Sequence, residues 1–363
     1  MGAVRHLYVH LPFCARRCGY CDFVTVVGRR ELHAAYVDAL LRELELEREL
    51  LAPRLETVYL GGGTPTFTEP AALARLLAAL PPADEVTVEA NPETVTPELA
   101  SLLRAQGVTR VSLGAQSFQP RLLSVLDRKS SPEQVRQAVA ALRAAGIDNV
   151  SLDLLYGIPG QSSADLDADL AHALALGPEH LSCYELEAKP GTRFAHAWGA
   201  ELARQAEAIE PYMEQVVERL VSAGYRWYET ASFCRPGREA RHNLAYWLGR
   251  DYLGVGIGAV STLGHHRLRN RPQLAAYLAA LARGERPPRE VELLPPPVRL
   301  KERVMLSLRL DRPLSMPEVA GVIDERALPR LEALRLVERR GEELALTFRG
   351  RFLGDAVTAE LLV

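Results

Sequence analysis

Strand-like and helix-like segments alternate through the first half of the chain, and this alternation limits the folds available to it. Short apolar runs predict strands over residues 7–10, 57–60, 85–89, 110–114, 150–155 and 180–185. Apolar residues recurring three and four apart predict helices over 31–52, 71–80, 98–106, 132–145 and 164–176. Such repeats build a parallel sheet with right-handed crossovers. Since six repeats are fewer than a closed barrel needs, we predict an α/β fold, a partial (β/α)6 barrel with its chemistry at the carboxyl ends of the strands.

The alternation weakens after about residue 190. We expect a helix over 201–224, a strand over 225–229 and, from the prolines of 286–297, a linker. Residues 298–363 are typical of short helices and a β-hairpin turning at Gly341, a winged-helix-like pattern. We therefore predict a core barrel over 1–230, a connecting segment over 231–290 and a small C-terminal domain over 291–363.

Charge and hydropathy exclude several classes of protein. Lys and Arg number 43 against 46 Asp and Glu, a net charge of −3, which excludes a broadly basic nucleic-acid binder. Residues 298–363 hold 12 basic and 11 acidic side chains, too balanced for a phosphate-binding face, so we expect no nucleic-acid partner. No run approaches the ~18 apolar residues of a membrane span. The amino-terminal apolar stretch is too short for a secretion signal, and we expect a cytoplasmic protein.

Three cysteines stand close together, directly after the first predicted strand. Cys14, Cys18 and Cys21 can bind three irons of one [4Fe-4S] cluster, which leaves the fourth iron open to an exchangeable small molecule. The five cysteines of the chain are an odd number and fit no tidy disulfide framework. The alternative is structural zinc, held by the same cysteines with His6 or His10.

A glycine-rich loop, Gly61-Gly-Gly-Thr-Pro-Thr66, follows the second predicted strand. Glycines let a ligand approach the backbone closely, and exposed amides there can bind the polar groups of an amino acid. The loop would open at the same edge of the sheet as the cysteines. A glycine-rich turn after a strand is common, so the loop is informative only together with the cysteines.

Together the two motifs resemble the radical S-adenosylmethionine (SAM) superfamily, whose signature is CxxxCxxC plus a GGTP-like loop. In that superfamily SAM chelates the open iron. In order and spacing, the chain further resembles the anaerobic coproporphyrinogen III oxidase family through residues 8–14, 61–66, 88–92, 113–118 and 153–159. The resemblance covers nearly the whole chain, including the C-terminal domain, which is similar to the C-terminal domain of that family.

The resemblance also implies a SAM site. Glycines and Thr64 of the second motif would hold the methionine moiety, while later polar residues would reach its amino-acid and ribose groups. Two tyrosines would lie beside the cluster. The implied SAM residues are Tyr8, Tyr20, Gly62, Gly63, Thr64, Glu89, Gln116, Arg128 and Asp153, with Cys14, Cys18 and Cys21 as the cluster ligands.

Two departures from the oxidase point to its HemW branch, the haem chaperones. The chain reads Cys21-Asp-Phe where the oxidase has a further cysteine, and Tyr8 begins the family pattern almost at once. The branch signature HNxxYW is present as His242-Asn-Leu-Ala-Tyr246-Trp247. The resemblance thus implies a protein that binds a [4Fe-4S] cluster, SAM and haem and transfers haem to acceptor haemoproteins. The alternative is an oxygen-independent coproporphyrinogen III oxidase that forms protoporphyrinogen IX by radical decarboxylation.

His242 is the expected haem ligand. A neutral imidazole is a good axial ligand to iron, and flat aromatic side chains can cover a porphyrin face. The alternative is a histidine that caps a helix beside ordinary core aromatics. Cys234 is a second candidate for the axial ligand, whereas Cys183 is expected to be buried and inert.

The resemblance further implies partners. They are haem-accepting proteins, respiratory haemoproteins above all, and an electron donor of flavodoxin or ferredoxin type. It allows a homodimer, and association with a membrane surface through clients only.

Overall fold

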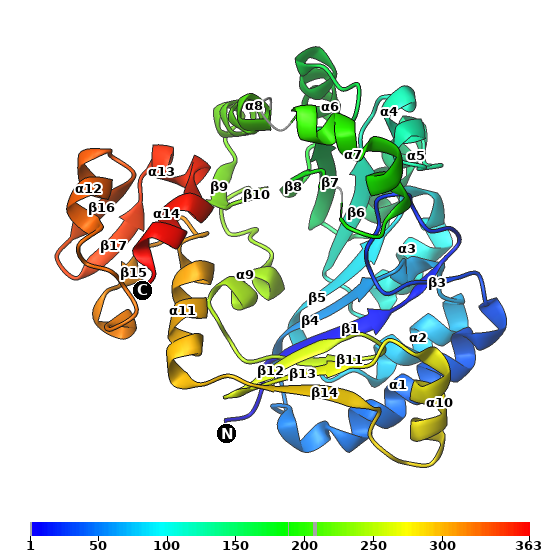
Figure 1. The fold of residues 1–363 in the computed structure, drawn as a ribbon. Coiled ribbons are helices and arrows are strands. Elements are labelled where there is room, and N and C mark those ends of the chain that lie inside the picture. Colours follow the sequence, from blue (N-terminus) through cyan, green and yellow to red (C-terminus); the bar gives the residue numbers. More distant parts are fainter. Residues whose placement is uncertain (1, 188, 206–208) are drawn as a thin grey trace.

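The computed structural model describes residues 2–187, 189–205 and 209–363. Its centre is a nine-stranded sheet with the order β11-β1-β4-β5-β6-β7-β8-β10-β9 (Figure 1). The six predicted strands are present and pair in parallel, which confirms the open barrel. They are β1 (His6–Leu11), β4 (Leu55–Gly62), β5 (Ala83–Ala90), β6 (Arg110–Gln116), β7 (Val150–Tyr156) and β8 (His180–Glu185).

Three short strands extend this sheet at its two edges. The segment β11 (Leu253–Val255) pairs in parallel with β1, although nearly the whole barrel separates them in sequence. At the other edge β10 (Ser232–Cys234) pairs antiparallel with both β8 and β9 (Arg226–Glu229). The first strand of the chain is therefore an interior strand of the sheet.

The predicted helices cover one face of the sheet (Figure 1). They are α1 (His33–Leu46), α2 (Pro70–Ala79), α3 (Pro97–Ala105), α5 (Pro132–Ala144) and α6 (Ser163–Ala175), and α4 (Pro120–Val125) was not predicted. Ser131 and Ser162 each form a capping box with the residue three positions later. Such caps satisfy the amides that a helix start leaves free, which is why these helices begin where the sequence predicts.

The single helix predicted over 201–224 is wrong. Two helices are present, α7 (Arg193–Gln205) and α8 (Ile209–Ser222). A further short helix, α9 (Arg241–Trp247), follows β10 and packs against β4, on the side of the sheet opposite α1 to α6 (Figure 1). The polar interior of the barrel is thereby closed on one side by the segment that carries the HNxxYW signature.

The linker predicted over 286–297 is also wrong. Residues Arg289–Leu293 form β14, the edge of a three-stranded antiparallel sheet with β12 (Val260–Leu263) and β13 (His266–Asn270). Helix α10 (Leu274–Ala282) connects β13 to β14 and packs on α1, and α11 (Pro296–Ser307) begins directly after β14. The expected boundary between residues 290 and 291 falls within β14.

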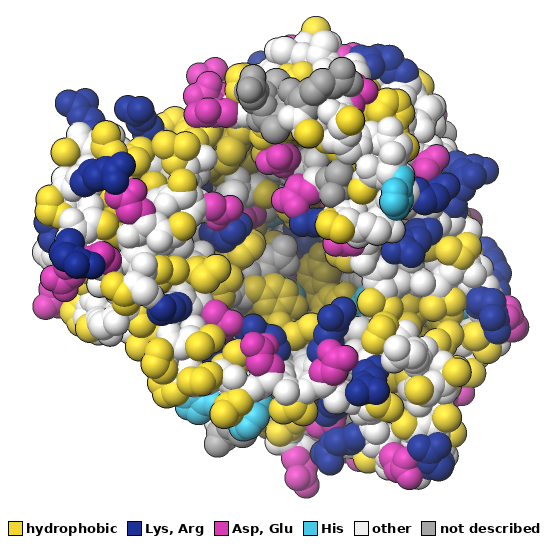
Figure 2. Space-filling view, viewed as in Figure 1, with side chains coloured by type: hydrophobic (Ala, Val, Ile, Leu, Met, Phe, Trp, Pro, Cys, Tyr) yellow, Lys and Arg dark blue, Asp and Glu magenta, His cyan; other side chains and the backbone are white. Residues whose placement is uncertain are grey.

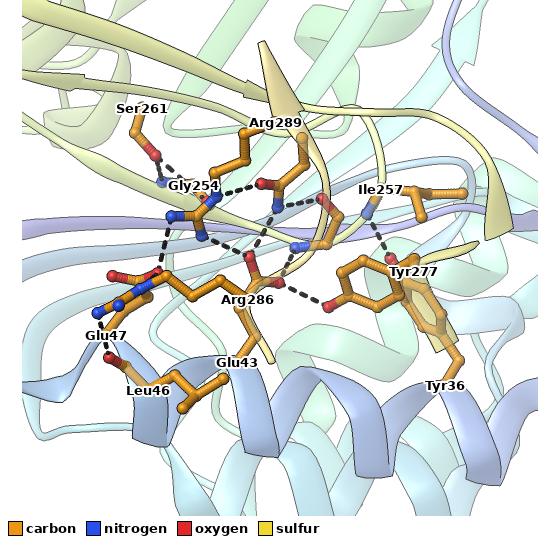
Figure 3. Close-up of polar contacts among 12 residues, drawn as sticks. Tyr36, Glu43, Leu46, Glu47, Gly254, Ile257, Ser261, Tyr277, Arg286 and Arg289 are labelled. Carbon is orange, nitrogen blue, oxygen red and sulfur yellow. Dashed lines mark hydrogen bonds and ion pairs between the residues drawn. The ribbon is translucent and has the colours of Figure 1, made fainter. Parts of the chain in front are cut away.

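A buried polar network holds this sheet to α1 (Figure 3). The carboxylate of Glu43 is fully buried and accepts hydrogen bonds from Tyr277 at 2.6 Å, Asn270 at 2.7 Å and the Gly256 amide at 2.8 Å. It also pairs with the Arg289 guanidinium at 3.0 Å. Burial raises the pKa of Glu43, and these donors oppose that effect. Because the partners satisfy the buried carboxylate, the network fixes residues 256–289 to the first helix.

The C-terminal domain contains α11, β15 (Leu314–Ser315), α12 (Leu328–Ala333), β16 (Val337–Arg340), β17 (Glu343–Leu346), α13 (Phe348–Phe352) and α14 (Gly354–Leu361). Its sheet has the order β15-β17-β16, and the hairpin turns at Gly341 with a φ of +64°, as predicted. The domain contacts the barrel at Trp227, over whose ring the Arg351 guanidinium lies at 3.6 Å. Across the described ranges no helix combines the length and apolar character that a bilayer span requires.

Candidate functional site

A cavity of about 390 Å³ opens at the carboxyl ends of the barrel strands. In Figure 2 the molecule is hollowed at its centre, between the barrel and the C-terminal domain, with charged side chains at the rim. Most of the expected site residues line the cavity, although they come from six separate segments. They are Cys14, Cys18, Tyr20, Cys21, Gly62, Gly63, Thr64, Glu89, Gln116, Arg128 and Asp153.

The cysteine loop is closed by a pair of two-residue strands. Strand β2 (Phe13–Cys14) pairs in parallel with β3 (Val26–Val27), so the two ends of the cysteine loop lie side by side. Within the loop the Cys21 amide donates to the Cys18 carbonyl at 3.3 Å. Burial raises the pKa of the Cys14 thiol to about 11. The thiol is therefore protonated at neutral pH, and it loses its proton only when a cation such as iron stabilises the thiolate.

The described contacts do not favour the zinc alternative, because His10 is engaged through both ring nitrogens and His6 through its Nδ1. His10 contacts the Tyr8 hydroxyl at 3.0 Å and the Val24 carbonyl at 2.8 Å, and His6 contacts Thr57 at 2.9 Å. Within the described ranges no three His, Cys, Asp or Glu side chains converge on a single ion. A cubic cluster makes no such demand, since each cysteine binds a different iron.

The glycine loop requires its glycines. Gly62 has a φ of +114°, and a Cβ on Gly63 would lie 2.5 Å from the Pro12 carbonyl oxygen. The next residue, Thr64, donates its amide to the Phe13 carbonyl at 2.9 Å, and its hydroxyl lies 3.5 Å from the Cys14 sulfur. The two motifs of the sequence thus form one continuous wall of the cavity.

Asn91 joins the glycine loop to Arg128, and the sequence did not single it out as a site residue. Its amide donates to the Thr64 hydroxyl at 3.0 Å, and its oxygen accepts from Arg128 at 2.7 Å. Arg128 also donates to the Gly114 carbonyl at 2.8 Å and approaches the Cys18 sulfur at 3.6 Å. Asn91 lies within residues 88–92, one of the segments that carry the family resemblance, and this position was the sequence feature that could have identified it as a site residue.

Glu89 is the acid closest to the glycine loop. Its carboxylate accepts from the Tyr59 hydroxyl at 2.7 Å and from the Gly62 amide at 3.0 Å. Burial raises the pKa of Glu89 to about 7, and the neighbouring Asp153 contributes to the rise. A bound ammonium group would lower that pKa again, so this carboxylate is suited to a cationic ligand.

The raised pKa of Glu89 predicts a pH-dependent change in stability. The folded protein holds this proton more tightly than the unfolded chain, so the free energy of unfolding falls as the pH rises from about 4.5 to 7 and stays lower above 7. Glu89→Gln removes that loss. We expect the variant to exceed the wild type by about 2 kcal/mol at pH 8 and to match it near pH 5, as measured by urea unfolding.

Glu187→Gln is the matched control, because Glu187 lines the same cavity with an exposed side chain. Its difference from the wild type should be the same at both pH values. A Glu89→Gln difference that does not change with pH would contradict the buried, protonated carboxyl.

The remaining acid and amide of the expected set lie on neighbouring strands. Gln116 ends β6 at a register shift and has a φ of +64°, a conformation uncommon for a non-glycine residue. The Asp153 carboxylate accepts from the Ser112 hydroxyl at 3.1 Å, and burial raises the pKa of Asp153. Tyr20 lines the cavity, whereas Tyr8 stacks on Tyr59 and positions His10.

His242, like Tyr8, is an expected cofactor-binding residue that does not line the cavity. Its side chain is buried, with Nδ1 2.7 Å from the Thr57 hydroxyl and Nε2 2.8 Å from the Tyr246 hydroxyl. Its ring stacks on Tyr59 with 5.2 Å between centroids. Burial lowers the pKa of His242 to about 3, so the imidazole is neutral. In the described conformation neither ring nitrogen is free to bind iron.

Both isolated cysteines are buried. Cys183 lies in β8, as expected of an inert residue. Burial raises the pKa of the Cys234 thiol to about 12, which disfavours the thiolate that an axial haem ligand would need. Neither lines the cavity.

Comparisons with known proteins agree with this geometry. A family model of the radical SAM superfamily matches residues 8–173. The heme chaperone HemW of Mycobacterium tuberculosis (strain CDC 1551 / Oshkosh) is 40% identical over 98% of this chain and 94% of that protein. HemW of Bacillus subtilis (strain 168) is 30% identical over 99% of each chain. The structure of coproporphyrinogen III oxidase, HemN, from Escherichia coli matches with a TM-score of 0.83 at 23% identity, over 98% of this chain and 90% of that one.

The barrel, the cysteine loop and the glycine loop define a radical SAM protein, a class that implies a [4Fe-4S] cluster and SAM as cofactors. The likeness to HemN shows a common fold. Identity of 30–40% over almost the full length narrows the class, and the chain belongs to the HemW family of haem chaperones.

Proposed function

We propose that this protein is a haem chaperone that binds a [4Fe-4S] cluster, SAM and haem, and passes haem to acceptor haemoproteins. The observation that carries the proposal is the cavity shared by three cysteine thiols, a glycine cradle and two partly buried acids. Sequence identity of 30–40% over almost the full length with proteins named heme chaperone HemW supports haem as the molecule that is carried.

Each part of the cavity has a distinct role in this proposal. Cys14, Cys18 and Cys21 would hold the cluster, which when bound supplies an electron and one open iron. Gly62, Gly63 and Thr64 would accommodate the methionine moiety of SAM. A side chain at either glycine would collide with neighbouring atoms of the protein, so this wall of the cavity exposes backbone to the ligand. Tyr20 would flank the cluster, and Tyr8 would act indirectly, through the hydrogen bond between its hydroxyl and His10.

The charged residues of the cavity suit a ligand that is both cationic and hydroxylated. Glu89 and Asp153 are partly buried acids, and neither forms an ion pair within the described residues. Gln116 adds an amide. These side chains would bind the ammonium and ribose groups of SAM. The buried Nε of Arg128 has no partner, so it would donate a hydrogen bond to an anionic group of the ligand near Cys18.

Haem capture is the part of the proposal that requires movement. The neutral imidazole of His242 is the form that binds iron, but its Nε2 is bonded to the Tyr246 hydroxyl. We propose that Tyr246 moves away when haem arrives, while Thr57 continues to hold Nδ1. The hydrogen bond to Nδ1 would then orient the ligating ring, as outer partners of metal-binding histidines do.

The test is haem transfer under anaerobic conditions. Protein with reconstituted cluster and bound haem is mixed with an apo-haemoprotein, and the acceptor's own spectrum should appear with a rate that changes on addition of SAM. The same preparation is given coproporphyrinogen III and a reductant. Formation of a vinyl product with turnover, without haem transfer, would replace the chaperone with the decarboxylase.

A further inference from the structure

Arg110 is the bulkiest side chain that is fully buried, with 2% of it exposed at the start of β6. Among the described residues no hydrogen bond or ion pair reaches its guanidinium, and Nε is buried without any partner. A buried charge of this kind is costly unless an acceptor satisfies it. Within the described ranges no side chain accepts a hydrogen bond from it, and Glu89 and Asp153 interact with it through charge alone.

The polar neighbours of Arg110 are already committed to other groups. The Asp153 carboxylate accepts from the Ser112 hydroxyl through both of its oxygens. His180, whose pKa is lowered by burial and by Arg110, contacts Ser151 at 2.8 Å and the Tyr228 hydroxyl at 2.8 Å. These neighbours influence Arg110 through charge, and none of them accepts a hydrogen bond from it.

Arg110 lines the cavity from the first residue of β6, at the end of that strand opposite the cysteine loop, and this part of the cavity is here called its interior end. Arg110 pairs in register with Thr87 of β5. In its own strand Arg110 lies four residues before Gly114. At about 3.3 Å per residue, its backbone is ~13 Å along β6 from that of Gly114, whose carbonyl accepts a hydrogen bond from Arg128. Asn243 of α9 lines the same cavity, and its side-chain amide has no hydrogen-bond partner within the described ranges.

We propose that the interior end of the cavity binds the carboxylate group of a second ligand, beyond the SAM site. Arg110 donates two parallel N–H···O bonds and the Asn243 amide a third, since a guanidinium fork matches the geometry of a carboxylate. A singly charged group fits best, because Glu89 and Asp153 lie in the same cavity and would repel a phosphate dianion. The carboxylate is either a haem propionate, which rests on the proposed function, or that of a free small acid.

The test compares hemin, hemin dimethyl ester and sodium propionate on the full-length protein and on Arg110→Gln. If haem supplies the carboxylate, hemin binds the wild type roughly tenfold more tightly than its ester does, and the variant loses that difference. If a free acid supplies it, hemin and ester bind alike, and sodium propionate raises the unfolding midpoint of the wild type but not of the variant. Arg104→Gln, an exposed arginine, should behave as the wild type in both arms.

Stability and SAM affinity separate this role from a structural one. Arg110 has no hydrogen-bond partner to lose, so Arg110→Gln should unfold at or above the wild-type midpoint. Its effect on SAM affinity should be smaller than its effect on the carboxylate ligand, because Arg110 acts on Glu89 and Asp153 only through charge. Arg110→Lys keeps the charge without the fork and should give an intermediate affinity.

Three results would overturn the proposal. The first is a lower unfolding midpoint for Arg110→Gln than for the wild type, and the second is a loss of SAM affinity as large as the loss of affinity for hemin or propionate. The third is that hemin, its ester and propionate all act alike on the variant and on the wild type. Failure of hemin to bind either protein, with propionate still selective, would instead refute only the haem-chaperone function.

Discussion

Cys18→Ala, reconstituted without oxygen, is expected to carry at least about tenfold less iron and sulfide than the wild type. The thiol of Cys18 is partly exposed in the cavity and is approached by the Arg128 guanidinium at 3.6 Å. Since loss of an outer-shell partner alone costs 10- to 100-fold in metal affinity, loss of a direct ligand costs no less. Chemical analysis for iron and sulfide, with the visible spectrum, measures the effect.

Cys183→Ala is the matched control for this experiment. Cys183 is also a thiol in the barrel, but it is buried in β8 and does not line the cavity. The control should retain the full iron and sulfide content, with at most a modest loss of stability from the small cavity it creates. Equal cluster content in Cys18→Ala and the wild type would remove Cys18 from the ligand set.

His242→Ala is expected to lower the free energy of unfolding by about 3 kcal/mol. The ring is buried between Tyr59, on which it stacks, and the two hydroxyls of Thr57 and Tyr246. Its removal leaves a cavity and leaves both hydroxyls without their partner. Urea unfolding of the apoprotein measures the loss, and His266→Ala, on an exposed strand position, should change stability little.

Tyr246→Phe separates a haem ligand from a structural histidine at the same position. This change removes the hydroxyl that occupies Nε2 but keeps the aromatic ring. If His242 ligates haem, Tyr246→Phe binds hemin at least as tightly as the wild type, because the nitrogen is already free. If folded His242→Ala shows the same Soret maximum as the wild type, His242 is not the axial ligand and its role is structural.

The repeating half of the molecule was predictable from local sequence. Strands such as β5 and β7 carry apolar residues at alternate positions, and helices such as α5 begin at a Ser-Pro-Glu cap, so short-range rules locate them. The cysteine and glycine loops follow strands directly, and parallel strands bring such loops to one edge. Shared position at that edge is the reason that so many expected residues line one cavity.

Features that depend on distant partners could not be predicted in this way. Strand β11 has three residues, too few for a periodic signal, and it exists because β1 offers an unpaired edge. The prolines of 286–297 indicated a linker, yet Arg289 is tied to Glu43, far away in sequence. The burial of His242 was equally hidden, since spacing within HNxxYW does not reveal that β4 covers the ring.

The pairing of β1 with β11 and the tie between Glu43 and Arg289 have a consequence for how the protein is made. A ribosome delivers the cysteine loop early, but the strand beside it and the arginine that neutralises the first helix emerge only with the last third of the polypeptide. Until then the edge of β1 that pairs with β11 has no partner strand, and the Glu43 carboxylate, which is buried in the folded protein, has no counter-charge. The edge of the sheet beside β1 is therefore paired, and the buried carboxylate of Glu43 neutralised, only after translation has passed residue 289.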